Sequence, residues 1–215
     1  MTKTSRLIDA TTGTNTARIG VGTAPFGVAI TPDGSKAFVA NSGDGTVSEI
    51  ALATGAVTAT IPVGTAPVGV ATTPNGAQVY VANSGSGSVS VIAAASGAVT
   101  GTITVGATPS GLAVTPDSAH VYVANKGAGT VSVISTATGT VTATVSVAGS
   151  PFGVAITPDG TKAYVTNEAG GVTVITTANN SVADPARSAR GQWAFPSRRT
   201  AAMPSSPISP QAPSR

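Results

Sequence analysis

The sequence predicts an all-β protein, a β-propeller whose blades are 42-residue, four-stranded antiparallel sheets. The first observation is a repeat: a Pro-x-Gly segment followed by Val-Ala or Leu-Ala begins at residues 25, 67, 109 and 151, which are 42 positions apart. A fixed period of this length is typical of arrays whose single units cannot bury their apolar face alone. The second observation is the composition, with 26 Gly and 41% hydrophobic residues among 215, which favours many short strands joined by tight turns. About four blades are present.

One copy of the repeat contains four strand-like segments separated by turn residues. In the second copy these segments are residues 68–72, 78–83, 88–92 and 98–105. The second of them, Gln-Val-Tyr-Val-Ala-Asn, alternates and is rich in strand-forming residues. A Pro-Asn-Gly turn precedes it, because Pro fixes φ and Asn-Gly tolerates positive φ. Four short antiparallel strands per unit is the layout of a propeller blade, and no segment carries a helical apolar period of helical length.

The repeats predict a propeller over residues 1–183. A leading half-blade, made of a third and a fourth strand, covers residues 4–22, and four blades follow over residues 25–63, 67–105, 109–147 and 151–183. An open partial propeller is favoured over a closed four-bladed ring, in which Ala17–Val21 would pair with the third strand of the last blade. Because an open arc leaves apolar faces and strand edges uncovered, we expect it to be capable of self-association.

The charge and the prolines set the end of the chain apart. Residues 1–183 carry six Lys or Arg against seven acidic residues, a net charge of −1, whereas residues 184–215 carry five Arg against one Asp, a net charge of +4. Near-neutral repeats argue against nucleic-acid binding. Six of the 15 prolines fall in residues 184–215, which predicts a disordered, basic tail rich in Pro, Ser and Arg. There are two alternatives for this tail. It binds acidic surfaces, or it is translated out of frame after a frameshift.

Three further features are missing from the sequence. The chain has no Cys, which excludes disulfides and thiolate metal sites. No stretch approaches the roughly 18–20 apolar residues that a transmembrane helix requires. The first residues carry no apolar segment that would act as a signal peptide.

One signature recurs at the end of the second strand of every blade. Residues 164–167 read Tyr-Val-Thr-Asn, and close variants occupy residues 38–41, 80–83 and 122–125. With the preceding Thr-Pro-Asp-Gly turns, these motifs give residues 4–183 a resemblance to the YVTN β-propeller repeat family, which includes YncE-like and surface-layer propellers. The resemblance implies a propeller, commonly of seven blades, a protein or cell-envelope partner, and an extracellular or cell-envelope location. Having fewer repeats and no visible export signal, the chain is expected to be a truncated or frameshifted member.

Two sets of recurring residues are candidates for a binding face. Asn41, Asn83, Asn125 and Asn167 close the second strands, where we expect their side chains to bond neighbouring turn backbone. A ring of amides that binds a polar ligand is the alternative. Phe26 and Phe152 follow the repeated Pro, where we expect them to pack between blades. Their alternative role is to shape the mouth of the central channel.

The acids and the single His suit structural roles. Asp33, Asp117 and Asp159 occupy the first turn of their blades, where a carboxylate accepts turn hydrogen bonds; a carboxylate ring for a metal is the weaker alternative. His120 takes the place of a Lys in other copies, so we expect it on the surface of a strand. We assign no catalytic, cofactor-binding or metal-ligating residue, and no cofactor.

Three functions are compatible with these observations. The favoured one is a non-enzymatic scaffold of surface-layer or cell-envelope type that mediates protein or ligand interactions. A propeller enzyme of lactonase or lyase type is the first alternative, but such a site needs blades that differ, and the identity between these copies is too high for such specialisation. A nucleic-acid-binding propeller is the second alternative.

Overall fold

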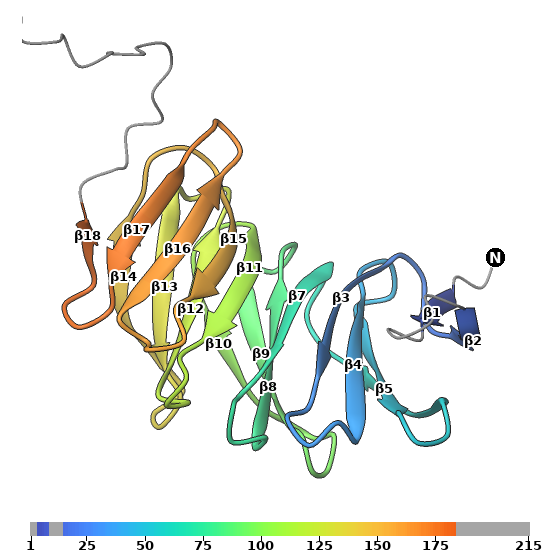
Figure 1. Cartoon of the computed structure of the whole chain (residues 1–215). Coiled ribbons are helices and arrows are strands. Elements are labelled where there is room, and N and C mark those ends of the chain that lie inside the picture. Colours follow the sequence, from blue (N-terminus) through green and yellow to red (C-terminus); the bar gives the residue numbers. More distant parts are fainter. Residues whose placement is uncertain (1–3, 9–14, 184–215) are drawn as a thin grey trace, which may run out of the picture.

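The computed structural model describes residues 4–8 and 15–183, and within them every regular element is a β-strand (Figure 1). Blade 1 contains β3 (Pro25–Ile30), β4 (Lys36–Asn41), β5 (Thr46–Ala51) and β6 (Ala56–Pro62). Blade 2 contains β7 (Pro67–Thr72), β8 (Gln78–Asn83), β9 (Ser88–Ala93) and β10 (Val99–Thr104). Blade 3 contains β11 (Pro109–Val114), β12 (His120–Asn125), β13 (Thr130–Ser135) and β14 (Thr140–Ser146). Blade 4 contains β15 (Pro151–Ile156), β16 (Lys162–Asn167), β17 (Val172–Thr176) and β18 (Ser181–Ala183), and a separate hairpin contains β1 (Thr4–Ile8) and β2 (Asn15–Gly20).

Each blade is a four-stranded antiparallel sheet in which consecutive strands are neighbours. The four sheets follow one another along an arc, with β1 and β2 at the end next to blade 1 (Figure 1). Among the described strands, β2 pairs only with β1, and β17 pairs with β16 and β18, so no hydrogen-bonded pairing closes the arc. The predicted propeller is confirmed, and the open arc, rather than the closed four-bladed ring, is the form found. The predicted tail, residues 184–215, lies outside the described residues.

The core lies between blades. The second and third strands of blades 1 to 3 are buried along nearly their whole length. An aromatic residue in each second strand is fully enclosed, with Phe38 and Tyr80 at 0% exposure and Tyr122 at 1%. Each of these aromatics belongs to a cluster that also contains residues of the next blade. A single blade therefore buries little, and the stability of the arc depends on the contacts between blades.

The first strands of successive blades approach one another so closely that only Gly fits between them. A Cβ atom added to Gly27 would lie 2.2 Å from the carbonyl oxygen of Val68. The same atom on Gly69 would lie 2.2 Å from Ser110 O, and on Gly111 it would lie 2.5 Å from Phe152 O. In blades 1 to 3, the Gly of the Pro-x-Gly segment is thus required by packing between blades.

The segments that lead into blades 1, 2 and 3 carry a strained residue immediately before the repeated Pro. Ala24, Ala66 and Thr108 have φ of 48°, 50° and 51°, a region that residues with a side chain rarely adopt. Their carbonyl groups accept hydrogen bonds of 2.9–3.0 Å from backbone amides at the end of the second strand of the blade they introduce. The surrounding contacts therefore hold the linker in this conformation. Within the described residues, no helix has the length and apolar character needed to cross a membrane.

Candidate binding site at the inner strands

The residue after the repeated Pro lines the same hollow in all four blades. This hollow has a volume of about 300 Å³ and lies along the first strands β3, β7, β11 and β15. Phe26, Val68, Ser110 and Phe152 occupy this position, which gives the hollow a largely apolar wall with two aromatic rings. We call it the inner hollow. A concave, mostly apolar surface with few polar groups is the usual form of a binding site.

Phe26 and Phe152 are not packed between blades, contrary to the sequence-based expectation. Phe26 is 66% exposed and Phe152 is 40% exposed, because both side chains border the inner hollow. The alternative, that they shape the mouth of the channel, describes their position. Lys126 is the charged residue of the lining; its ammonium lies 5.8 Å from the centre of the Phe152 ring and forms a 2.7 Å ion pair with Glu168. These contacts restrict both the Phe152 ring and the cation.

The four Asn residues have an internal role in the blades. Asn41, Asn83 and Asn125 are 0% exposed, and so in this arrangement they are not available as a binding face. Their side-chain Nδ2 groups donate to hydroxyl groups of the neighbouring third strand rather than to turn backbone. In blade 2 the acceptors are Ser88 Oγ at 3.2 Å and Ser90 Oγ at 2.9 Å. The Oδ1 atoms of all four Asn residues are buried and have no hydrogen-bond partner among the described residues.

Replacing Asn83 with Ala is expected to lower the free energy of unfolding by about 1–3 kcal/mol, because two buried hydrogen bonds are lost. Urea unfolding followed by circular dichroism measures this change. Asn75→Ala is the matched control, since Asn75 is exposed and its Oδ1 accepts a single bond from Ala77 N. A smaller loss for Asn83→Ala than for the control would contradict the internal role.

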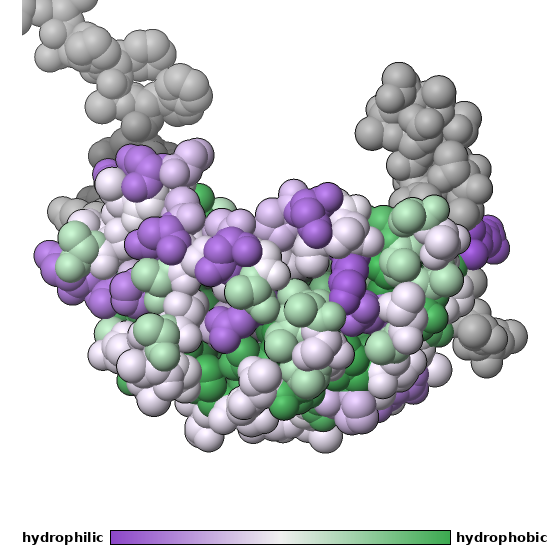
Figure 2. Space-filling model, turned by 90° about the horizontal axis from the view of Figure 1, so that it is seen from below, coloured by the Kyte–Doolittle hydropathy of each residue, from purple (hydrophilic) through white to green (hydrophobic). Residues whose placement is uncertain are grey.

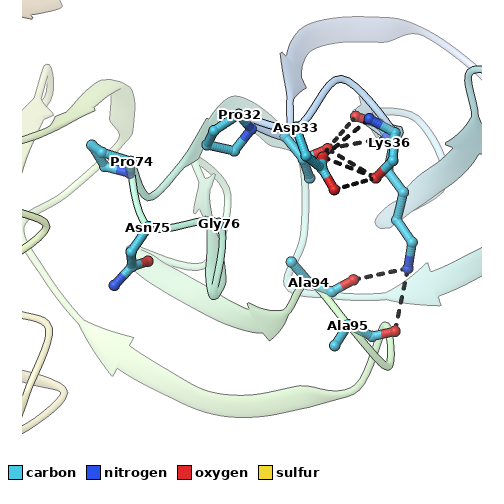
Figure 3. A pocket seen from close by; sticks show the side chains of 10 residues that line it. Pro32, Asp33, Lys36, Pro74, Asn75, Gly76, Ala94 and Ala95 are labelled. Atoms are coloured by element: carbon cyan, nitrogen blue, oxygen red, sulfur yellow. Dashed lines mark hydrogen bonds between the residues drawn. The ribbon is translucent and has the colours of Figure 1, made fainter.

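A second kind of pocket lies at the other end of the blades, between their turns. The pocket between blades 1 and 2 is lined by the first turns of both blades and has a volume of about 320 Å³ (Figure 3). Lys36 crosses it and donates to Ala94 O at 2.9 Å and Ala95 O at 3.3 Å, as Figure 3 shows. Lys36 also forms a 3.0 Å ion pair with the buried Glu49. This cation thus ties blade 1 to blade 2.

The equivalent pocket between blades 3 and 4 contains several titratable groups. Asp117, His120, Tyr122 and Asp159 line a volume of about 400 Å³. The Tyr122 hydroxyl donates to Asn180 Oδ1 at 2.6 Å. His120 is partly exposed at the start of β12, close to its predicted position on the strand surface. In the part of the chain that the structure describes, no three His, Cys, Asp or Glu side chains are grouped so that they could hold a metal ion.

The first-turn acids act as turn acceptors. The Asp33 carboxylate accepts bonds from the Thr31 hydroxyl at 2.5 Å and from the backbone amide of Ser35 at 3.0 Å. These bonds lower the pKa of Asp33 from 3.8 to about 2. The same arrangement lowers the pKa of Asp117 and of Asp159. Because the carboxylate is favoured in the folded state, its contribution to stability is present above the unfolded pKa and is lost as the pH falls through the folded pKa.

Thr31→Val is expected to raise the pKa of Asp33 toward 3.8, because the hydroxyl is the largest cause of the shift. The stability that the protein loses as Asp33 is protonated, between about pH 4 and pH 2, should then be smaller. An NMR titration of the Asp33 side-chain carboxyl carbon measures the pKa. Thr31→Ser keeps the hydroxyl and should leave the pKa of Asp33 low. An unchanged pKa in Thr31→Val would show that the amide and the hydroxyl of Ser35 hold the carboxylate.

The matching family is that of the YncE-like β-propellers, whose model covers residues 51–175. The chain belongs to this family. The match confirms the resemblance that the YVTN-type motifs indicated. No curated protein sequence matches this YncE-like propeller.

Solved structures show the same architecture. The propeller is similar to hydrazine synthase from Kuenenia stuttgartiensis, with 31% identity, a TM-score of 0.71, and coverage of 76% of this chain and 50% of that chain. A functionally unknown protein from Desulfotomaculum acetoxidans is 21% identical, with a TM-score of 0.70; the match covers 79% of this chain and 57% of that chain. The dihydro-heme d1 dehydrogenase NirN, in complex with DHE, is 20% identical, with a TM-score of 0.69; the match covers 84% of this chain and 40% of that chain. The chain thus spans about half the length of these proteins.

Sequence reasoning missed the ionic contacts between blades. Lys126 and Glu168 occupy the same repeat position 42 residues apart, which is a signal that aligned copies do contain. The Lys36–Glu49 ion pair lies within blade 1, and Lys36 reaches blade 2 through its bonds to Ala94 O and Ala95 O. These contacts give no such signal, because they depend on how far one turn reaches toward the next blade. The inner hollow was foreseen only as an alternative.

Proposed function

We propose that this YncE-like propeller is a non-enzymatic binding module that receives an apolar group of a protein partner, such as an aromatic side chain, in the inner hollow. The observation that carries the proposal is the convergence of Phe26, Val68, Ser110 and Phe152, from four blades, on one apolar hollow. An extracellular or cell-envelope location belongs to the same proposal and is supported by the family resemblance.

The chemistry of the lining favours an uncharged group. The Lys126 ammonium is paired with Glu168, so an incoming phosphate or carboxylate would compete with an existing ion pair. Neither a carboxylate nor a His lines the inner hollow among the described residues, whereas an enzyme of lactonase or lyase type would need such groups near the axis. The titratable cluster around His120 lies at the opposite end of the blades. These features support binding over catalysis.

The size of the hollow sets the expected affinity. A phenyl ring that buries roughly 120 Å² of apolar surface gains about 3 kcal/mol, which corresponds to millimolar binding. A single aromatic side chain is therefore expected to bind weakly and rapidly. A protein partner would add contacts along the exposed rims of the first strands to reach a useful affinity.

The experiment is an NMR titration of the monomeric protein with N-acetyl-phenylalaninamide. The expected result is a set of shifts confined to amides around the hollow, such as Gly69, Gly111 and Gly153. The double variant Phe26→Ser/Phe152→Ser should weaken binding at least about tenfold, since most of the apolar contact is removed.

Val28→Ser/Val172→Ser is the matched control. Val28 is 62% exposed and Val172 is 39% exposed, close to the values for Phe26 and Phe152, but neither lines the hollow. Equal weakening in both double variants, or shifts spread over the outer strands, would overturn the proposal. Shifts confined to the pocket around His120 would move the binding site to the turns.

A further inference from the structure

Each end of the arc exposes one of the two faces that pack together at the boundaries between blades. We call such a boundary a joint. Inside the chain, the aromatic residue of one blade packs against the first strand of the next: Tyr80 shares a cluster with Leu112 and Val114, and Tyr122 shares one with Val154 and Ile156. This joint occurs at every internal boundary between blades. Its two halves are a trailing face, which carries the aromatic residue, and a leading face, which carries the first strand.

The leading face of blade 1 is uncovered. Val28 is 62% exposed and Ile30 is 54% exposed, while their equivalents Leu112 and Val114 are buried or half-buried against Tyr80. Figure 2 shows hydrophobic surface at the end of the crescent that holds blade 1, as well as along the lower edge of the rest of the crescent. The hairpin β1–β2 contributes Ile19 to this side, but it supplies only a third and a fourth strand, so none of the described strands stands opposite the first strand.

The trailing face of blade 4 is uncovered in a complementary way. Tyr164 is 41% exposed, whereas its equivalents Phe38, Tyr80 and Tyr122 are at most 1% exposed. Val172 is 39% exposed, and the corresponding Val of each other blade is at 0%.

Gly153 locates the missing neighbour. In the other three blades, a Cβ atom on the equivalent Gly would meet a carbonyl oxygen of the next first strand at 2.2–2.5 Å. On Gly153 such an atom would meet only Thr166 Oγ1 of its own blade, at 3.0 Å. The space that the next first strand fills in the other blades is therefore open beside Gly153.

We propose that the trailing face of blade 4 in one copy of this chain docks on the leading face of blade 1 in a second copy. Tyr164 then covers Val28 and Ile30, and Gly153 faces Phe26 O, in continuation of the internal joints. The two faces differ, so the contact is head-to-tail, and a pair satisfies both ends only by closing into a ring. Two arcs of four blades give eight, which lies within the range of known propellers. This inference does not rest on the proposed function.

The hairpin β1–β2 must be displaced when the joint between two copies forms. It occupies the position of the third and fourth strands of a preceding blade, which is also where β17 and β18 of the second copy would lie. We expect the amides of residues 15–20 to lose protection from hydrogen exchange on association.

A cross-linking experiment tests the joint, because the chain has no native Cys. Lys126 and Glu168 face each other across the internal joint of blades 3 and 4, and the corresponding partner of Glu168 in a second copy is Ser42. The single variants Ser42→Cys and Glu168→Cys are mixed and treated with a short bismaleimide. The expected product is a cross-linked pair from the mixture and none from either variant alone. Lys126→Cys/Glu168→Cys, cross-linked within one chain, is the positive control for reach.

Gly153→Ala is the matched disruption, since its added Cβ should block the docked backbone as it would in the internal joints. It is expected to weaken association at least tenfold, measured by light scattering, while Gly101→Ala, with open space around residue 101, leaves association unchanged. Circular dichroism confirms that both variants fold. A chain that stays monomeric at every concentration overturns the proposal, as does cross-linking of Ser42→Cys alone or Glu168→Cys alone, which would indicate like faces in contact.

Discussion

Replacing Gly69 with Ala is expected to lower the free energy of unfolding by about 3 kcal/mol. The new Cβ would lie 2.2 Å from Ser110 O and 3.3 Å from the carbon of the same carbonyl, and both are backbone atoms. The first strands of blades 2 and 3 must then separate, and overpacking of this kind costs typically 1–3 kcal/mol and more where backbone cannot move. Urea unfolding at neutral pH, with the midpoint and slope compared with those of the parent, measures the change.

The same substitution at Gly153 is the control. This Gly occupies the same repeat position, but only a side-chain hydroxyl lies near its added Cβ, at 3.0 Å. We expect a loss below about 1 kcal/mol in the monomer, since a side chain can rotate away. If Gly69→Ala and Gly153→Ala destabilised the protein equally, the cost would reflect strand propensity, and the close approach between blades would not be its cause.

Replacing Tyr80 with Ala is expected to cost about 3–5 kcal/mol, the largest effect of any single truncation proposed for this protein. Its ring is fully buried between blades 2 and 3, and its hydroxyl donates to Gln78 Oε1 at 2.9 Å. Burial also raises the pKa of the Tyr80 phenol. Removal leaves a cavity that β8 and β11 both line, and neither strand can close it without leaving its own sheet. Thermal and urea unfolding measure the loss.

Tyr164→Ala is the control for Tyr80. Tyr164 has the same position in its repeat but is 41% exposed. We expect less than half the loss seen for Tyr80→Ala in the monomeric protein, because a ring that keeps contact with water leaves a smaller cavity. A loss of similar size at both positions would mean that the end blade is covered in solution at the concentration used, and the measurement repeated on diluted protein separates the two cases.

The strand pattern was accessible from the sequence because each blade repeats it. Alternation in Gln-Val-Tyr-Val-Ala-Asn and the Pro-Asn-Gly turn are local signals, and β8 follows them. The Asn side chains were placed correctly at the strand ends, but their acceptors were not, since a hydroxyl of the next strand competes with turn backbone only once the register is known. Phe26 was expected to pack between blades, but it is exposed, because its exposure depends on where the first strands meet.

By itself, the sequence determined the unit: a 42-residue, four-stranded blade, its turns, and a Gly that every copy keeps. Because the repeats are similar, each predicts the same blade, and the sequence does not distinguish a blade inside the arc from a blade at its end. Only the tertiary structure decided that Tyr80 is buried while Tyr164 is exposed, and that Gly69 is crowded while Gly153 is open. The physical reason is that a blade's burial comes from its neighbours, and the number and closure of neighbours is a property of the arc as a whole.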